Sequence, residues 1–316
     1  MAMLMMENSE PAMQLENQLF ALPATLTDRW RTEHEKLNPT TILTDNGSAG
    51  DINFFIPPST SGLLSLADMI LELEVGIKVR QYVQLSGKLF SDLFDQSKPL
   101  CTGVPVNIRL VVSRPEFALR VWDTDTTKTF KPFIRNARLS VRRYIPSPDF
   151  LTAVAGELLK KTVKYHIERV VMRVSDIPQR TQSTVISNLQ IGQIPKVVFI
   201  GFVDSEDFHG SQKKNPFNFQ HFNITQISVE VDGQSYPTKP YTADFAHNLS
   251  LECYDGLLDT LGHRPSLQGG LPFNRTQYND GYTIFGFDLT PGHTGRGPLT
   301  LIKQGNLSVS VSLANH

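Results

Sequence analysis

The chain of 316 residues is long enough for two β domains or one large one. Apolar residues make up 40% of it and charged residues 19%, which excludes a disordered bulk. The formal net charge of −1 excludes an overall basic surface that would bind nucleic acid nonspecifically. The 20 prolines and 21 glycines fall between apolar runs as turn residues, a pattern that favours strands over helices.

The two cysteines, Cys101 and Cys253, are too few for a secreted disulfide scaffold and favour a reducing compartment. The first ten residues lack the charged start of a signal peptide, and no stretch approaches the ~18 apolar residues of a membrane span. We therefore expect a protein of the nucleus, the cytosol or a virion, neither secreted nor bound to membrane. The chain contains N-x-[ST] sequons, the acceptor pattern for N-glycosylation, and we interpret them as chance occurrences. They begin at Asn46, Asn223, Asn248, Asn274 and Asn306.

Residues 1–50 are predicted to form a polar N-terminal arm. Within it, Leu19–Trp30 is rich in apolar side chains, and Phe20, Leu22 and Trp30 are costly to leave in water. This segment is expected either to pack on a neighbouring chain or to fold back on its own domain, and the sequence does not distinguish the two.

A first β domain is predicted over residues 51–146, where short apolar runs alternate with turn residues. Turn signals such as Pro57-Pro58 and Thr102-Gly103 separate the runs at a spacing typical of sandwiches and barrels. The predicted strands are Asn53–Ile56, Leu66–Val75, Leu89–Phe94, Val104–Val112 and Arg138–Tyr144.

A helix over residues 147–161 is predicted to connect two domains. Ser147 is a suitable N-cap, Pro148 suits the first turn, and Asp149 favours the positive end of the helix dipole. Apolar residues recur at helical spacing, so one face is expected to be buried. They are Phe150, Leu151, Val154, Leu158 and Leu159.

A second β domain is predicted over residues 162–316. Its unbroken apolar run Val197–Val203 indicates a strand covered on both faces, whereas Thr225–Asp232 alternates and indicates one wet face. Asp232-Gly233 predicts a type I′ hairpin turn. Residues 255–280 are rich in turn formers and are predicted to be a long loop. The remaining predicted strands are Tyr165–Val174, Thr184–Ile191, Leu249–Tyr254, Tyr282–Leu289 and Leu299–Leu313.

Six segments, taken in order, resemble the double jelly-roll major capsid proteins of Polinton/Maverick elements and the related adintovirus group. The similarity covers nearly everything from Leu19 onward, and it rests on the order and spacing of the segments, because no single motif is diagnostic. They are Gly87–Leu110, Gly192–Lys196, Gly201–Phe219, Val231–Pro240, Gly281–Thr290 and Leu301–Leu307.

This resemblance implies an all-β fold of two tandem antiparallel jelly rolls joined by a short helix. It also implies a homotrimer with pseudo-sixfold symmetry that tiles an icosahedral shell together with other capsid proteins such as a penton. The chain differs from these capsid proteins in two ways, which suggest that it is a degraded or domesticated copy encoded by an integrated element. The chain runs directly from Val75 to Val83 where such proteins carry a long segment, which abridges the first jelly roll, and it stops at His316 soon after a strand.

Two groups of residues are candidates for contact with partners. A basic strip without acids could face genomic DNA on the inside of a shell, although a solvated strand face paired with acids elsewhere is the favoured interpretation. A loop rich in Phe and Lys is a candidate for contact between subunits. The strip comprises Lys128, Lys131, Arg135, Arg138, Arg142 and Arg143, and the loop comprises Phe208, Lys213, Lys214, Phe217 and Phe219.

Catalysis is not predicted. Asp204, Glu206 and Asp207 follow a strand, as the carboxylates of metal-dependent nucleases do, but a solvated turn is the favoured interpretation. His209 and His221 lack the spacing of a zinc site. We expect no cofactor and no metal. The alternative function, from a different class, is a carbohydrate- or ligand-binding β-sandwich module without catalysis.

Overall fold

The computed structural model divides into two compact units, each of which is described by itself. The first unit comprises residues 1–112 and 132–170, and the second comprises residues 113–131 and 171–316. The structure describes residues 31–43, 51–78, 81–94, 98–120, 132–165, 167, 169–262, 272–290 and 303–314.

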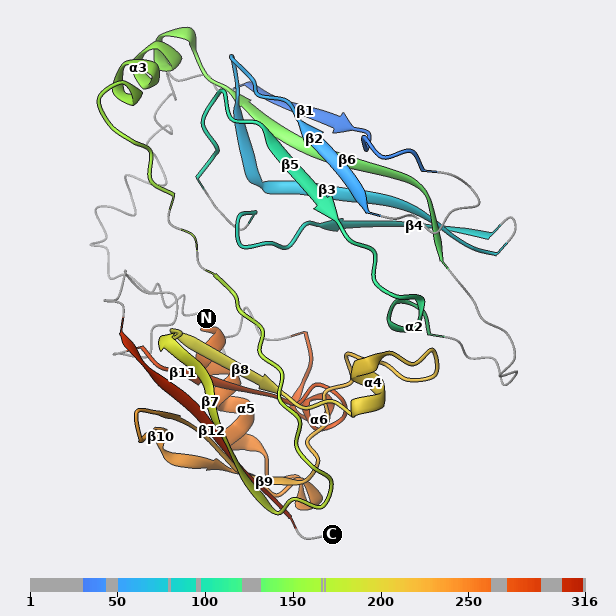
Figure 1. Cartoon of the computed structure of the whole chain (residues 1–316), viewed down its shortest axis with the longest axis vertical. Helices are drawn as coiled ribbons and strands as arrows, with labels where there is room; N and C mark the ends of the chain where they lie inside the picture. Colours follow the sequence, from blue (N-terminus) through green and yellow to red (C-terminus); the bar gives the residue numbers. More distant parts are fainter. Residues whose placement is uncertain are drawn as a thin grey trace, which may run out of the picture. The chain divides into compact units, whose positions relative to one another are not determined.

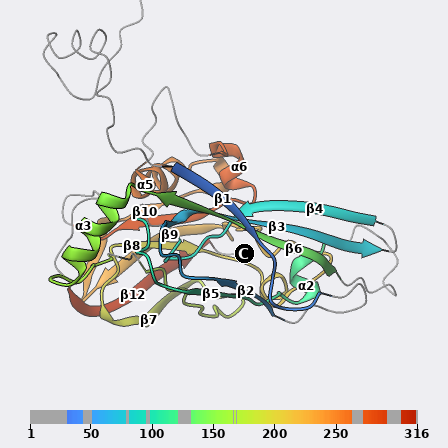
Figure 2. The ribbon, with the colours of Figure 1, turned by 90° about the horizontal axis from the view of Figure 1, so that it is seen from above.

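The first unit consists of two antiparallel sheets (Figures 1 and 2). The larger has four strands in the order β1-β6-β3-β4, and the smaller pairs β2 with β5. The four strands are β1 (Arg31–Leu37), β6 (Phe133–Ile145), β3 (Leu63–Lys78) and β4 (Gln81–Lys88), and the two are β2 (Ile52–Ile56) and β5 (Val106–Leu110).

The core of the first unit lies between its two sheets, because alternate residues of each strand point inward. Along β2, Ile52, Phe54 and Ile56 are buried while the residues between them are exposed. From β6, Leu139 and Val141 are completely buried in the same cluster. The short apolar runs of the sequence therefore form a two-layer sandwich.

Four strands predicted for the first unit form, with shifted ends, as β2, β3, β5 and β6. The strand predicted at Leu89–Phe94 is wrong, because β4 ends at Lys88 and turns follow. β4 pairs with β3 as an antiparallel hairpin at the place where the chain runs directly from Val75 to Val83. Within the predicted arm, Arg31–Leu37 forms β1 and pairs with β6.

The helix predicted over residues 147–161 forms as α3, which spans Pro148–Leu158 and lies within the first unit. Its predicted burial is wrong, because none of its residues is buried and Leu159 directly after it is 91% exposed. The apolar side chains of α3 therefore recur at helical spacing but are at most half-buried.

The second unit also combines a four-stranded antiparallel sheet with a two-stranded one. The larger sheet has the order β10-β9-β12-β7, and the smaller pairs β11 with β8. The strands are β7 (Ser183–Gln193), β8 (Val197–Gly201), β9 (Ile224–Val231), β10 (Gln234–Thr242), β11 (Ile284–Asp288) and β12 (Gln304–Leu313). The short helices are α2 (Pro115–Ala118), α4 (Ser205–His209), η1 (Phe245–His247) and α6 (Arg275–Asn279).

One longer helix, α5 (Leu251–Leu261), completes the second layer of this unit (Figure 1). It packs on β11, where a side chain on Gly286 would lie 2.9 Å from Thr260. It also approaches β10, where a side chain on Gly256 would collide with the ring of Tyr241 at 2.6 Å. Two glycines thus permit the close approach of helix and strands.

Four predictions for residues 162–316 are corrected. The strand predicted at Leu249–Tyr254 is wrong, because helix α5 begins at Leu251. Its apolar residues recur at helical spacing, namely Leu251, Tyr254, Leu257 and Leu258. In consequence, the loop predicted over residues 255–280 begins inside α5 and later includes α6.

The strand predicted at Tyr165–Val174 does not form among the described residues of that segment. The strand at Val197–Val203 ends at Gly201, and Phe199 is 49% exposed, so its two faces are not both covered.

Other predictions for this unit are confirmed in full or in part. Asp232 and Gly233 both adopt positive φ, as a type I′ turn requires. β9 forms with Ile227 and Val229 buried, but the predicted wet face is confirmed only in part, because Ser228 between them is only 4% exposed. In β12, Leu307, Val309 and Val311 are buried while the serines between them face outward.

Candidate functional site

The loop predicted to contact other subunits is organised around one lysine. Lys214 places its Nζ 2.7 Å from Glu206, 3.4 Å from Asp204 and 3.7 Å from Asp207. The three carboxylates come from α4 and its N-cap, where the side chain of Asp204 accepts a hydrogen bond from the Glu206 N–H at 2.9 Å. The residues predicted to be a solvated turn therefore form a short helix whose acids hold the loop through Lys214.

Burial separates Asp207 from the other two acids. Asp207 is only 4% exposed, and its Oδ1 has no hydrogen-bond partner. Desolvation therefore raises the pKa of Asp207, opposed by the positive charge of Lys214. The backbone N–H of Glu206 instead lowers the pKa of Asp204. Hydrogen bonding to Glu206 raises the pKa of Lys214, which keeps that lysine charged.

The aromatic residues of the loop differ in their roles. Phe208 and Phe217 are exposed, and Phe217 packs edge-to-face on Phe117 of α2 with ring centroids 5.5 Å apart. Phe219 is half-buried and closes over Gly201, where a side chain would lie 2.7 Å from its ring.

The loop therefore presents an exposed surface and an internal anchor. Phe208, Lys213 and Phe217 are exposed to solvent. Lys214 and Phe219 instead hold the loop to α4 and to the end of β8.

The basic strip lies on β6 in the first unit, except for Lys128 and Lys131, which lie outside the described residues. Arg135 contacts Glu74 at 3.4 Å and lies over the ring of Tyr82. Arg142 contacts Asp68 at 3.2 Å.

Alternation along β6 divides the remaining arginines between two faces of the sheet. Arg143 contacts Glu35 of β1 at 3.0 Å and donates to the carbonyl of Pro57. Arg138 lies opposite Glu72 in register, and the carboxylate of Glu72 binds Lys36 at 2.9 Å. Neighbouring strands therefore supply carboxylates to arginines of the strip, and these arginines do not share a single solvated face.

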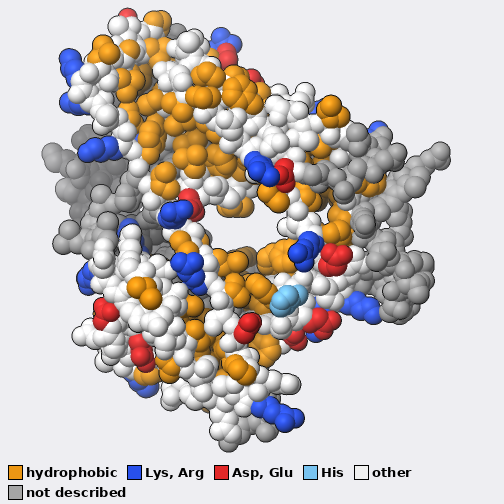
Figure 3. All heavy atoms as spheres, viewed as in Figure 1, with side chains coloured by type: hydrophobic (Ala, Val, Ile, Leu, Met, Phe, Trp, Pro, Cys, Tyr) orange, Lys and Arg blue, Asp and Glu red, His pale blue; other side chains and the backbone are white. Residues whose placement is uncertain are grey.

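Apolar side chains are exposed on strand faces in both units, and Figure 3 shows such side chains at the molecular surface. In the first unit, Val83 and Leu85 lie opposite Val75 and Leu73, which pack on the core. Residues directly opposite share a face, so β4 turns these two side chains toward the inner side of the sheet. Even so, Leu85 is 52% exposed, because the two-stranded layer of β2 and β5 does not cover it.

In the second unit, exposed apolar residues lie on β7 and β8. Val185 and Ile191 pair with Ser310 and Asn306 of β12, on the outer face of the larger sheet. Phe199 lies on the side of β8 that faces away from the core. The sequence analysis identified Phe217, in the loop, as a candidate for contact, but it did not identify these exposed positions on β7 and β8.

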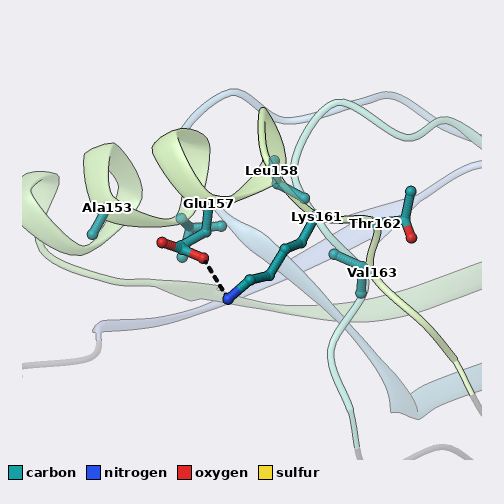
Figure 4. Close-up of a pocket in the computed structure, with 7 residues that line it drawn as sticks. Ala153, Glu157, Leu158, Lys161, Thr162 and Val163 are labelled. Carbon is teal, nitrogen blue, oxygen red and sulfur yellow. Dashed lines mark ion pairs between the residues drawn. The ribbon is translucent and has the colours of Figure 1, made fainter.

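A hollow of about 260 Å³ lies between α3 and the segment that follows it (Figure 4). Its lining is mostly apolar and includes Val154, Leu158 and Val163. At its edge, Glu157 and Lys161 form an ion pair at 3.2 Å, drawn as a dashed line in the figure. The apolar spacing of the helix was visible in the sequence, but the incomplete burial of its apolar side chains was not.

Within the described ranges, no cluster of three or more His, Cys, Asp or Glu residues has the arrangement of a metal site. Cys101 and Cys253 are both free thiols. Burial raises the pKa of Cys253 to about 12, which keeps it protonated and unreactive at neutral pH. Of the helices that the structure describes, none is long and apolar enough to cross a membrane.

Comparison with known proteins gives a distant relative without an assigned role. No known family profile matches the chain. A Caenorhabditis elegans protein described as "Uncharacterized protein F54H12.2" is 25% identical over 231 residues. The match covers 72% of this chain and 55% of that relative, so the chain spans about half of its length.

Proposed function

We propose that this chain is a non-enzymatic structural subunit that associates with copies of itself, as the major capsid proteins it resembles do. The observation that carries this proposal is the apolar surface on the strand faces of both units. Val83 and Leu85 in the first unit and Phe199 in the second are large side chains whose exposure to water is unfavourable.

Association would remove these side chains from water. Full burial of one large apolar side chain contributes about 1.5–3 kcal/mol. Association itself costs about 4–15 kcal/mol in lost freedom of motion, so several such residues must be buried together. Because both units expose apolar residues, association can bury more of them than a single patch on one unit would provide.

The similar construction of the two units supports a trimer with pseudo-sixfold symmetry. Each unit combines a four-stranded antiparallel sheet with a two-stranded sheet around its own core. Two units of similar construction in each chain would give a trimer six similar building blocks. Each unit has six strands among the described residues, whereas a jelly roll has eight. We therefore propose the jelly-roll arrangement on the resemblance of the sequence together with this two-layer plan.

Light scattering coupled to size-exclusion chromatography tests the proposal on the full chain. We expect a trimer, or a larger particle, at micromolar concentration. A monomer at every concentration up to about 100 μM, a range in which interfaces of ordinary affinity form, would overturn self-association. If that monomer bound an array of glycans or small ligands, the chain would instead be a binding module.

A further inference from the structure

We propose that two copies of this chain pair along the outer edge of β4, antiparallel and across a twofold axis at Gln84. The proposal rests on the self-association inferred above and specifies one of its contacts. β4 lies at the end of the order β1-β6-β3-β4, and no strand that the structure describes pairs with its other side (Figure 2). The backbone N–H and C=O groups on the outer side of such a strand are a template for a further strand.

The two edges of this sheet differ in charge. β1, at one edge, carries Arg31, Glu33, Glu35 and Lys36. Charged side chains of this kind protect an edge strand from pairing with another chain. Residues 81–87 of β4, at the other edge, carry no charged side chain. The sheet therefore protects one edge and leaves the other suited to a partner strand.

The accessible surface of β4 is suited to strand pairing. The side chains of Tyr82, Val83 and Leu85 are all exposed. A side chain built on Gly87 would meet no described atom within 4 Å, so the space beside the backbone is open there. A second strand can therefore approach β4 and remove apolar side chains from water.

The sequence of β4 is self-complementary in one register. In an antiparallel pair, residues directly opposite share a face of the sheet. With the twofold axis at Gln84, Val83 lies opposite Leu85 of the second copy, and the symmetry repeats this pair. With the axis at Leu85, Val83 would instead lie opposite Gly87. With the axis at Val83, Leu85 would lie opposite Gln81. Of these three registers, the axis at Gln84 alone gives both apolar residues an apolar partner from the other residue type.

The contact would continue the antiparallel sheet across two copies, with β4 of one copy beside β4 of the other. The same strand contributes to both sides, as a twofold interface requires. A threefold trimer contains no twofold axis, so the partner strand belongs to a copy in a neighbouring trimer. The edge of β4 would thus join trimers to one another.

Disulfide trapping tests the twofold axis on the full chain with Cys101→Ser as background, because the remaining Cys253 is buried. Residues directly opposite in antiparallel strands have Cα atoms about 4.5–5.5 Å apart, which a disulfide can span. Gln84→Cys should therefore form a disulfide-linked dimer at least tenfold faster than the matched control Ser86→Cys. Ser86 is exposed on the same face, but in this register it would lie about 13 Å along the strand from its copy.

Light scattering on the same samples separates this proposal from self-association itself. Equal or faster trapping by Ser86→Cys would overturn the twofold contact. Trapping at neither position in a sample that forms trimers or larger particles would overturn the twofold contact and leave self-association in place. Trapping at neither position in a monomeric sample would overturn both.

A charge on the inner face of β4 provides a second test. Val83→Lys should slow the trapping of Gln84→Cys about tenfold or more, because the lysine would lie opposite Leu85 of the second copy. Val83 is already exposed, so the fold should tolerate the change. The control is Val111→Lys, at an exposed residue of the same unit outside β4. Equal trapping rates in the two variants would contradict the proposal.

Discussion

The two units share one plan but complete it differently. In the second unit, α5 extends the layer of β8 and β11, and its Cys253 and Leu257 contribute to the core. In the first unit, the corresponding layer consists of β2 and β5 without a helix of that kind among the described residues. The inner side chains of β4 are exposed as a consequence. A helix can thus replace strands in closing a sandwich, and a layer without it leaves apolar surface for a partner.

The largest effect is expected from removing the contact between α5 and the core of the second unit. Leu257→Ala leaves a cavity at a residue that is only 2% exposed, and it should lower the free energy of unfolding by about 2–5 kcal/mol. Hydrogen exchange measured by mass spectrometry should then accelerate in β10 and β11 and stay unchanged in β6.

The control for this prediction is Leu251→Ala in the same helix. Leu251 is exposed, so the change should stay within about 0.5 kcal/mol. Faster exchange in β6 of the Leu257→Ala variant would show that the two units do not unfold independently.

A smaller effect on stability, with a large effect on assembly, is expected from changes to the exposed inner side chains of β4 in the first unit. Replacing Val83 and Leu85 together by serine removes exposed apolar surface, so stability should change by no more than about 0.5 kcal/mol per site. Light scattering should nevertheless show weaker self-association, because the proposed contact loses two anchors.

The matched control is Gln84→Ala, which lies between these residues and points to the other face of β4. This variant should associate as the parent does. If the double variant and the parent had the same oligomeric state, the face of β4 that carries Val83 and Leu85 would not be a contact surface.

The sequence predicted most strands but not how each layer is closed. The alternating runs of β9 and β12 pair with neighbours as their apolar periodicity indicated. β10 was missed because Pro237 and Pro240 interrupt it, although an edge strand tolerates proline. The start of α5 was misassigned as a strand, although Leu251, Tyr254, Leu257 and Leu258 recur at helical spacing.

The candidate contact residues were predictable only as chemical types. Phe217 and Phe219 stand two positions apart, yet one is exposed and the other closes over Gly201. That difference depends on where β8 ends, which the unbroken run Val197–Val203 did not reveal. Likewise, the carboxylates that pair with the strip come from β1 and β3, far away in the sequence, so sequence reasoning could not assign them.

A further comparison concerns the two acids that flank Lys214. The folded-state pKa of Asp207 lies above 3.8, so its ionised form is destabilising near neutral pH. Asp207→Asn should therefore raise the free energy of unfolding at pH 7. The gain should diminish as the pH falls toward 3.8, where the parent carboxyl also becomes neutral. Thermal unfolding at a series of pH values measures this difference.

Asp204→Ala is the opposite case and serves as the control. The folded-state pKa of Asp204 lies below 3.8, so its stabilising contribution is present above 3.8 and is lost as the pH falls through the folded pKa. Loss of this N-cap should cost about 1 kcal/mol at pH 7. If both variants changed stability in the same direction at pH 7, the proposed difference in burial between the two acids would be contradicted.

The smallest effect is expected from the basic strip. Arg142→Gln breaks a partly exposed pair with Asp68, which should lower stability by no more than about 1 kcal/mol. Because Asp68 already neutralises Arg142, we also expect no change in the retention of duplex DNA or in its salt dependence. The control is Lys128→Gln with Lys131→Gln, at the end of the strip outside the described residues. A slope of log affinity against log salt that fell by about one in the Arg142→Gln variant would identify a phosphate contact and overturn the assignment of this arginine to the sheet.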